Sequence, residues 1–345
     1  MINTRIEKSA SELLNTPYLA LSQRYDYMKV LCKTYGHKLY FAKQYVDGIV
    51  THILPFTVIS RPILGKRIVS MPFDGSYGDV ICVSFGSVTA DLYQCILNFA
   101  YENDIMHIEI RTRDPYHPIL TEMGFSKNIS LIISEINLDE IKKNNRLNRK
   151  KRSSLHISSV KGLKISMSSD IEDLKKFYHI MSINMRSYGT PMYPYSYFKN
   201  MWYEFFVKGE LALIKCTYKE KMVGGMLLFI GQHTSIMKYT SALSKYFFAR
   251  PYAALNWTAI DFCIQNGCKI LNMGTSFYND DGLVAAKKGF GAENIPLVAY
   301  TLDLKNKSAS LTELQERYNK LIKLWKYQPL VTSQLLGNVF WRWFC

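Results

Sequence analysis

Two stretches of the chain share one pattern, in which two apolar runs flank a short polar turn. Residues 38–56 read KLYFAKQYVDGIVTHILPF, and residues 211–229 read LALIKCTYKEKMVGGMLLF. The two stretches align without a gap and pair Tyr45 with Tyr218 inside the motif. Apolar runs on either side of a short polar turn are typical of two antiparallel strands. Each stretch therefore predicts a β-hairpin.

A second pair of stretches shares a different pattern. Residues 90–112 (ADLYQCILNFAYENDIMHIEIRT) align without a gap with residues 253–275 (AALNWTAIDFCIQNGCKILNMGT). In both, apolar residues recur at helical spacing, a polar turn follows, and a short apolar run ends the stretch. Each stretch predicts a helix, a turn and a strand. A helix is also expected before each hairpin, with Gly36 and Gly209 just ahead of the first strand.

Two matching blocks in the same order indicate an internal repeat. The 345 residues then divide into two similar α/β halves of roughly 150 residues each. The predicted fold class is α/β (α+β), with two tandem GNAT-like domains, because helix, hairpin, helix, strand is the skeleton of the GNAT acyltransferase fold. We assign the N-terminal domain, a basic connector, the C-terminal domain, and a C-terminal helix with an aromatic tail to residues 1–140, 141–165, 166–305 and 306–345.

Composition narrows the class of protein. Hydrophobic residues make up 48% of the chain, which is enough for a packed core and excludes a disordered protein. Lys and Arg number 43 against 28 Asp and Glu, so a net charge of +15 favours an anionic partner such as RNA, a nucleotide-linked sugar or an acidic membrane. The seven cysteines form no Cys-x-x-Cys pair, so we expect reduced core residues in a cytoplasmic protein and no metal site.

The chain contains no uncharged apolar run of about 18 residues, which predicts no transmembrane segment. Any membrane contact is expected to be peripheral, at the inner face. The segment after Pro329, LVTSQLLGNVFWRWFC, has the aromatic and basic composition of a membrane-interface anchor. Packing back on the body of the protein is the alternative. Before it, a capping box at Ser310 and Glu313 predicts a helix.

Several motifs resemble those of the FemAB-like family, whose members carry two GNAT-like domains in tandem and make peptide or amide bonds without a ribosome. The resemblance covers nearly the whole chain. This sequence departs from the family pattern at Asn272, where relatives often have Asp, and at Ala286, where a Phe usually precedes the lysine. The motifs are RIVSMPFDGSYGDV (67–80), HIEIRTR (107–113), NRKKR (148–152), SINMRSYGTPMYPYSYF (182–198), MKYTSA (237–242) and AKKGFGAENIPL (286–297).

The resemblance implies a transferase that moves an aminoacyl group from aminoacyl-tRNA, or an acyl group, to an amine of a cell-envelope precursor or related small molecule. Transfer RNA is then a co-substrate, the acceptor is an anionic small molecule or is lipid-linked, and no other cofactor is required. Two alternatives stay open: a CoA-dependent GNAT-type N-acyltransferase, and a non-catalytic RNA- or membrane-binding protein. Residues 248–254 (FARPYAA) contain no glycine and include Pro251, which disfavours acetyl-CoA bound in the GNAT manner.

Amide formation requires a positive or hydrogen-bonding group over the developing oxyanion. Lys287 precedes Gly289-Phe290-Gly291, where glycines let the backbone turn sharply, and it resembles the family lysine that faces the reacting carbonyl. We therefore predict that Lys287 is catalytic, against the alternative of a solvated surface lysine.

Substrate-binding candidates are one arginine and four tyrosines. Arg186 and Tyr188 resemble the pair by which the family grips an anionic acceptor. Tyr195 lies among alternating tyrosines that could line a groove, although loop packing is the commoner role for such residues. Tyr77 and Tyr239 are expected at strand ends in matching regions of the two halves, as hydrogen-bond donors.

A basic stripe occupies the predicted connector, and no acidic residue occurs from Ile141 to Ser169. Such a stripe attracts a phosphate backbone and would suit tRNA or a pyrophosphate carrier. A charged linker is the alternative. The stripe consists of Lys142, Lys143, Arg146, Arg149, Lys150, Lys151 and Arg152.

Overall fold

The computed structural model describes residues 1–14, 16, 19–61, 65–71, 77–305 and 325–344. One continuous sheet runs through both halves of the chain, in the order β1-β2-β3-β4-β6-β13-β7-β12-β11-β10-β9-β8, with the short β5 paired to β3. The strands are β1 (Ile2–Glu7), β2 (Lys38–Val46), β3 (Ile49–Arg61), β4 (Gly65–Val69), β5 (Ile81–Cys82), β6 (Ile105–Thr112), β7 (Ser126–Asn137), β8 (Leu163–Ser168), β9 (Leu211–Tyr218), β10 (Lys221–Phe229), β11 (Thr234–Ala242), β12 (Ile270–Phe277) and β13 (Ala292–Asp303).

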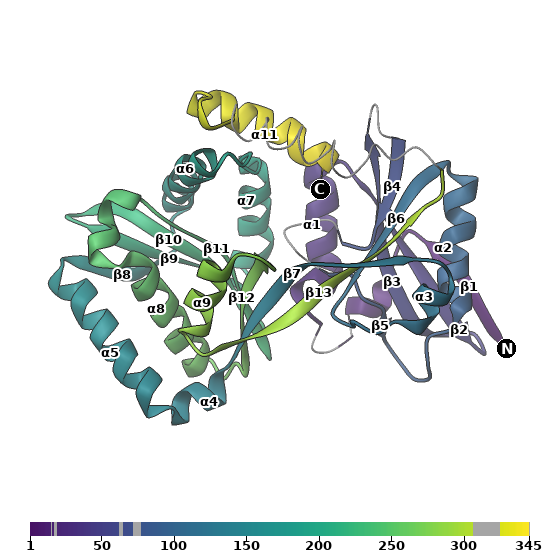
Figure 1. Cartoon of the computed structure of the whole chain (residues 1–345), viewed down its shortest axis with the longest axis horizontal. Coiled ribbons are helices and arrows are strands. Elements are labelled where there is room, and N and C mark those ends of the chain that lie inside the picture. Colours follow the sequence, from purple (N-terminus) through teal and green to yellow (C-terminus); the bar gives the residue numbers. More distant parts are fainter. Residues whose placement is uncertain (15, 17–18, 62–64, 72–76, 306–324, 345) are drawn as a thin grey trace.

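Helices pack on both faces of this sheet (Figure 1). The α-helices are α1 (Tyr25–Tyr35), α2 (Ala90–Glu102), α3 (Pro118–Glu122), α4 (Leu138–Lys143), α5 (Asn145–Val160), α6 (Ile171–Tyr188), α7 (Tyr195–Met201), α8 (Pro251–Gln265), α9 (Asp281–Lys288) and α11 (Leu330–Phe344). Short turns of other helix types are η1 (Ser11–Leu14), η2 (Leu21–Gln23), η3 (Trp202–Phe206) and η4 (Ser244–Ala249).

Both predicted hairpins are confirmed, as β2–β3 and β9–β10. Their turns use left-handed backbone at both central residues, with φ of 49° at Asp47, 81° at Gly48, 46° at Lys219 and 63° at Glu220. Two left-handed residues are the geometry of the tight turn whose twist matches that of the flanking strands. The sequence of the second turn contains no glycine, yet the same conformation forms because the long apolar strands on either side determine it.

The predicted helix–turn–strand units are confirmed as well. Helix α2 leads into β6 in the first half, and α8 leads into β12 in the second. Helix α1 precedes the first hairpin, and Gly36 ends that helix with a left-handed φ of 72°. The two halves therefore repeat one α/β unit, as the sequence predicts.

The last strand of each half lies in the sheet of the other half. Strand β7 pairs with β12 from Asn137–Ile270 to Leu131–Phe277, and β13 pairs with β6 from Val298–Thr112 to Asp303–His107. The two exchanged strands also pair with each other, and Figure 1 shows them crossing between the halves. The boundaries assigned at residues 140 and 165 stay a prediction; α4 and α5 occupy most of that connector.

A shared core also joins the halves. Its buried side chains come from α1 in the first half and from α6, α7 and η3 in the second, and include Tyr27, Leu31, Phe177, Tyr197 and Phe205. Two further cores lie under α2 and under α8. Because the central core belongs to both halves, their relative position is fixed by apolar packing as well as by strand pairing.

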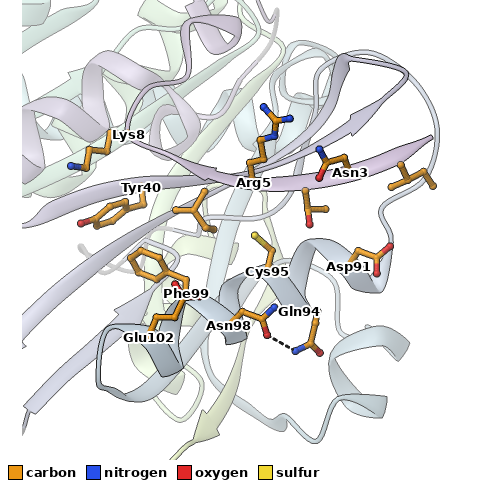
Figure 2. A pocket seen from close by; sticks show the side chains of 13 residues that line it. Asn3, Arg5, Lys8, Tyr40, Asp91, Gln94, Cys95, Asn98, Phe99 and Glu102 are labelled. Carbon is orange, nitrogen blue, oxygen red and sulfur yellow. Dashed lines mark hydrogen bonds between the residues drawn. The ribbon is translucent and has the colours of Figure 1, made fainter.

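The edge strands of the two halves differ in what covers them. Helix α5 packs on α8 and on the edge strand β8. At the other end of the sheet, the equivalent space between β1 and α2 is an open groove of about 990 Å³, whose lining includes Arg5, Tyr40, Gln94 and Asn98 (Figure 2). Helix α5 thus covers the edge strand of the second half, and among the described residues no equivalent helix covers β1 in the first half.

The C-terminal helix α11 packs on the body. The Trp341 ring stacks on Tyr193 with 4.3 Å between centroids, and its Nε1 donates to Pro191 O at 3.0 Å. The helix expected from Ser310 lies outside the described residues. Within the described ranges, none of the helices combines the length and apolarity that crossing a bilayer requires.

The expected burial of the cysteines is confirmed for four of them. Cys32, Cys216, Cys263 and Cys268 are buried, and burial raises the pKa of the Cys32 thiol to about 12. Cys82 is exposed and Cys95 is half-buried, so the expectation that every cysteine is a core residue was wrong at these two positions, and Cys345 lies outside the described residues. Cys82 lies in the two-residue strand β5, which pairs with β3 outside the main order of the sheet.

Candidate active site

Lys287 is a buried cation at the junction of the two halves. It lies near the end of α9, and only 7% of its surface is exposed. Its Nζ donates to Gly274 O at 2.9 Å and to Thr275 O at 3.0 Å. Burial lowers the pKa of Lys287 to about 8, and the charge of Asp280 opposes this only in part. The alternative of a solvated surface lysine therefore does not fit its surroundings.

An irregularity in β12 directs these two carbonyls toward Lys287. The pairing of β12 with β7 shifts register between Asn272 and Thr275, and Gly274 has a left-handed φ of 75°. The Asn272 side chain holds the turn, because its Oδ1 accepts from Gly274 N at 2.7 Å. Glycine takes up such backbone without steric cost.

A chain of polar contacts connects this turn to the N-terminal half. Asn272 Nδ2 donates to Glu135 Oε1 at 3.3 Å. Glu135 accepts two hydrogen bonds from Arg113, at 3.1 Å from Nη1 and 2.9 Å from Nη2. The Arg113 guanidinium lies 5.6 Å from the centre of the Tyr77 ring. These residues come from both halves and from the exchanged strand β7.

The pKa directions of this network reflect its burial. Burial raises the pKa of Tyr77, and its hydrogen bond with Arg113 offsets this only in part. For Arg113, burial alone would lower the pKa, but the hydrogen bond with Tyr77 and the charge of Glu135 hold it above its usual value. At neutral pH, Tyr77 is therefore a neutral hydrogen-bond donor beside a fixed cation.

The network contains two residues predicted from the sequence, Lys287 and Tyr77, and three that the prediction missed as site residues. Arg113 lies in the HIEIRTR motif, which the sequence singled out without assigning a role. Asn272 was singled out only as a departure from the family pattern. Glu135 gave no signal in the sequence, because only the pairing of β7 with β12 brings it to Asn272.

Arg186 and Tyr188 lie apart from these contacts, at the end of α6. Arg186 Nη1 donates to Gln328 O at 3.4 Å, just before α11. Tyr188 is 61% exposed and borders a small pocket of about 70 Å³ that Asn184 and Tyr252 also line. Their role in binding an acceptor stays a prediction.

Tyr239 and Tyr195 belong to an aromatic cluster. Tyr239 Oη donates to Tyr197 Oη at 3.0 Å, and its ring packs on Tyr193 and Phe198. The Tyr195 ring lies 5.1 Å from that of Tyr178. Tyr239 is 9% exposed, so its hydroxyl group is engaged within the core. The structure gives these two residues packing contacts and does not bring them to Lys287 by any described hydrogen bond.

The basic stripe forms the end of α4 and the first half of α5, and protein groups engage three of its residues. Lys142 pairs with Asp139 and Lys151 with Asp261, each at 2.8 Å. Lys150 Nζ donates to Gly289 O at 2.5 Å and lies over the Phe290 ring. The remaining four have exposed side chains and no hydrogen bond or ion pair with any described residue: Lys143, Arg146, Arg149 and Arg152.

The described part of the chain contains no group of His, Cys, Asp or Glu side chains arranged to hold a metal ion. The polar groups gathered at this junction are a buried ammonium, one arginine–carboxylate pair and a tyrosine. An ammonium has three donors, and two of those on Lys287 are engaged by backbone carbonyls. The third has no hydrogen-bond partner among the described residues beyond the carbonyls of Gly274 and Thr275.

The structure is similar to several solved structures at low sequence identity. FemX has a TM-score of 0.62 at 16% identity, over 92% of this chain and 100% of its own. A tandem GNAT protein from the clavulanic acid biosynthesis pathway has a TM-score of 0.58 at 9% identity, over 89% and 100%. The C-terminal domain of a protein assigned as a lysylphosphatidylglycerol synthetase in Agrobacterium fabrum has a TM-score of 0.59 at 12% identity, over 86% and 91%.

A family model described as acetyltransferase (GNAT) domain matches residues 142–282. No curated protein matches the chain. The protein is thus a tandem GNAT-fold protein, and the predicted FemAB-like tandem architecture is confirmed by its similarity to FemX and to the tandem GNAT protein. The family model also bears out the prediction of an enzyme of the acyltransferase class.

Proposed function

We propose that the protein transfers an aminoacyl or acyl group to an amine acceptor, and that Lys287 stabilises the tetrahedral intermediate. The observation that carries this proposal is the buried Nζ of Lys287, held by two carbonyls at the junction of both halves. As the amine attacks the donor carbonyl, negative charge develops on its oxygen. A preorganised cation in a site that excludes water stabilises that charge far better than water does.

The neighbouring network can position the acceptor. Tyr77 is a neutral hydrogen-bond donor and Arg113 is a cation. Glu135 holds the Arg113 guanidinium, which in turn lies over the Tyr77 ring. An acceptor bound between the halves could contact both groups while its amine approaches Lys287. The similarity to FemX and the surplus of basic residues support an anionic acceptor, such as a cell-envelope precursor, that reaches the site from a carrier.

Aminoacyl-tRNA is the donor that the surface of α5 supports. Its exposed arginines and Lys143 form a cationic surface of the kind that binds a phosphate backbone. Lys150, on the same helix, contacts Gly289, two residues from Lys287. A polyanion on α5 would therefore lie close to the element that carries the proposed catalytic group.

We predict that Arg146→Gln, Arg149→Gln and Arg152→Gln together weaken binding of mixed aminoacyl-tRNA and flatten its salt dependence. Three lost phosphate contacts should reduce the slope of log affinity against log salt by about two to three units. Filter binding across a salt series measures this. A matched control removes the same charge from exposed lysines of the first half, Lys29, Lys33 and Lys38. An unchanged slope in the α5 variant, or an equal change in the control, would show that the stripe is only a charged linker.

A CoA-dependent acetyltransferase is the second candidate, favoured by the description of the matched family model. The start of α8 argues against it. Arg250, the residue before the helix, gives no side-chain cap, and Pro251 at the first helical position has no N–H to offer a pyrophosphate. The segment before α8 contains two exposed phenylalanines, Phe247 and Phe248, and no glycine that would let the backbone approach a pyrophosphate.

Calorimetry distinguishes the two donors. We expect no saturable heat with acetyl-CoA at millimolar concentration, because the backbone donors that grip its pyrophosphate are incomplete. Micromolar binding that CoA competes away, and that substitutions within residues 248–254 abolish, would favour the acetyltransferase instead.

A further inference from the structure

The inner face of helix α11 is packed closely against the body of the protein. Ser333 on this face is fully buried. One turn further on, a Cβ added at Gly337 would collide with Met192 O, so the backbone of α11 approaches this carbonyl as only glycine allows. Gln334 Nε2 donates to Ser182 Oγ of α6 at 2.9 Å. These contacts fix which side of α11 faces the body and which side faces outward.

The outer face of α11 is apolar. Val331, Leu335, Leu336 and Val339 are between 44% and 66% exposed. They recur at helical spacing, so they form one stripe on the side opposite to the packed face. The sequence contains no charged residue from Leu330 to Trp341. We call Val331, Leu335, Leu336 and Val339 the aliphatic stripe.

An apolar outer face is unusual for a helix at the surface of a protein. Figure 1 shows α11 on the outside of the molecule, above α6 and reaching toward α1. A helix in this position normally turns polar and charged residues outward, and a helix that is apolar on all sides is normally buried or in contact with a membrane. Single exposed apolar residues are common, but a contiguous group of them marks an interaction site. The aliphatic stripe therefore indicates a surface that binds a partner.

The charges around the stripe indicate the kind of partner. Lys326, just before α11, and Arg342, in its last turn, are exposed at the two ends of the stripe. No acidic residue occurs in the sequence from Tyr318 to Cys345, and the whole chain has a net charge of +15. Aliphatic side chains offer no ring on which a base could stack, so a nucleic acid does not fit this face. An apolar stripe between cations is typical of a helix that lies in the surface of an anionic membrane.

We propose that α11 binds the surface of an anionic membrane through the aliphatic stripe, while its inner face stays packed on the body. The helix would lie parallel to the membrane, with the stripe at the boundary between headgroups and acyl chains. Because α11 packs on α6 and the Arg342 guanidinium packs over Gly36 at the end of α1, this contact would orient both halves relative to the membrane. The inference goes beyond the proposed function, since membrane binding requires neither donor nor acceptor.

Co-sedimentation of the full-length protein with vesicles tests the proposal. The wild type should bind vesicles of equal parts phosphatidylglycerol and phosphatidylcholine, and should bind phosphatidylcholine vesicles much more weakly. Leu335→Gln with Val339→Gln should weaken binding to the anionic vesicles about tenfold or more, because two apolar side chains lose their transfer into the membrane. Lys326→Gln should weaken it about fivefold, because one cation near the anionic surface is removed.

The matched control is Ile49→Gln with Val207→Gln. Both residues are exposed aliphatics outside α11, so this double variant should bind vesicles as the wild type does. The α11 double variant changes only exposed side chains and should keep the melting temperature of the wild type. A Lys287→Met protein should also bind vesicles normally. Failure of this inference is thus distinguishable from failure of the proposed chemistry, which turnover measures.

Three results would overturn the proposal: no sedimentation of the wild type above the level without vesicles, equal binding to neutral and anionic vesicles, or equal binding by the wild type and the α11 double variant. Light scattering without lipid adds a fourth. A wild-type dimer that becomes monomeric in the α11 double variant would assign the aliphatic stripe to contact with a second copy of the chain instead.

Discussion

Replacing Lys287 with Met should lower turnover by about 100-fold or more while the protein stays folded. The Lys287 ammonium is held by the Gly274 and Thr275 carbonyls, and in the proposed mechanism it neutralises the developing oxyanion. Without the ammonium, the free energy of the transition state should rise. Steady-state turnover and a thermal denaturation curve together measure the effect, and Lys288→Met is the matched control because Lys288 is the exposed neighbour.

The pH dependence of Lys287 gives an independent readout. Its pKa of about 8 in the folded protein lies below the ordinary value of 10.5. Above pH 8 the folded protein loses this proton while the unfolded chain keeps it, so the cost of burying the charge disappears and this residue's contribution to stability rises with pH. Oxyanion stabilisation falls over the same range. Turnover should therefore decline above about pH 8 in the wild type, and equal turnover by Lys287→Met and wild type would remove Lys287 from the mechanism.

Glu135→Ala should destabilise the protein by about 3 kcal/mol and also lower turnover, because it leaves the Arg113 guanidinium without its paired charge. The Glu135 side chain is 11% exposed and that of Arg113 is 33% exposed, so solvent compensates the loss only in part. Asn272 also loses a hydrogen-bond partner, and its hold on the Gly274 turn weakens. Chemical denaturation measures the free energy of unfolding.

Glu293→Ala is the matched control for this prediction. Glu293 lies opposite Glu135 in the pairing of β13 with β7, but its side chain is exposed. The loss of an exposed carboxylate should change stability by less than about 1 kcal/mol. If both variants were equally stable, the Arg113–Glu135 pair would have no role in holding the two halves together.

The repeat was predictable because each unit is local in sequence. The hairpin at Asp47 and the helix–turn–strand unit that ends at Thr112 each depend on residues that are close together along the chain. Their apolar periodicity survives divergence between the halves, so two ungapped alignments were enough to predict the architecture. The glycine-poor turn at Lys219 shows that the strands, more than the turn residues, determine the hairpin.

The candidate site was harder to predict because it depends on contacts between distant residues. Lys287 and Tyr77 lie in motifs with glycines nearby, which drew attention to them. Glu135 lies in an ordinary strand, and its surroundings follow from the pairing of β7 with β12. Tyr195 and Tyr239 show the reverse case: both tyrosines are conspicuous in the sequence, yet in the structure Tyr239 is buried in an aromatic cluster and the Tyr195 ring packs against Tyr178.

The exchange of β7 and β13 makes the order of synthesis matter for folding. The first half cannot complete its sheet until the residues that pair with β6, from Val298 to Asp303, have left the ribosome. Until then β6 and β7 present unpaired edges, which are prone to wrong pairing. Long-range pairing of this kind slows folding, since a loop of almost the whole second half must close first. The chain should therefore fold as one cooperative unit late in its synthesis, although its sequence is built from two similar modules.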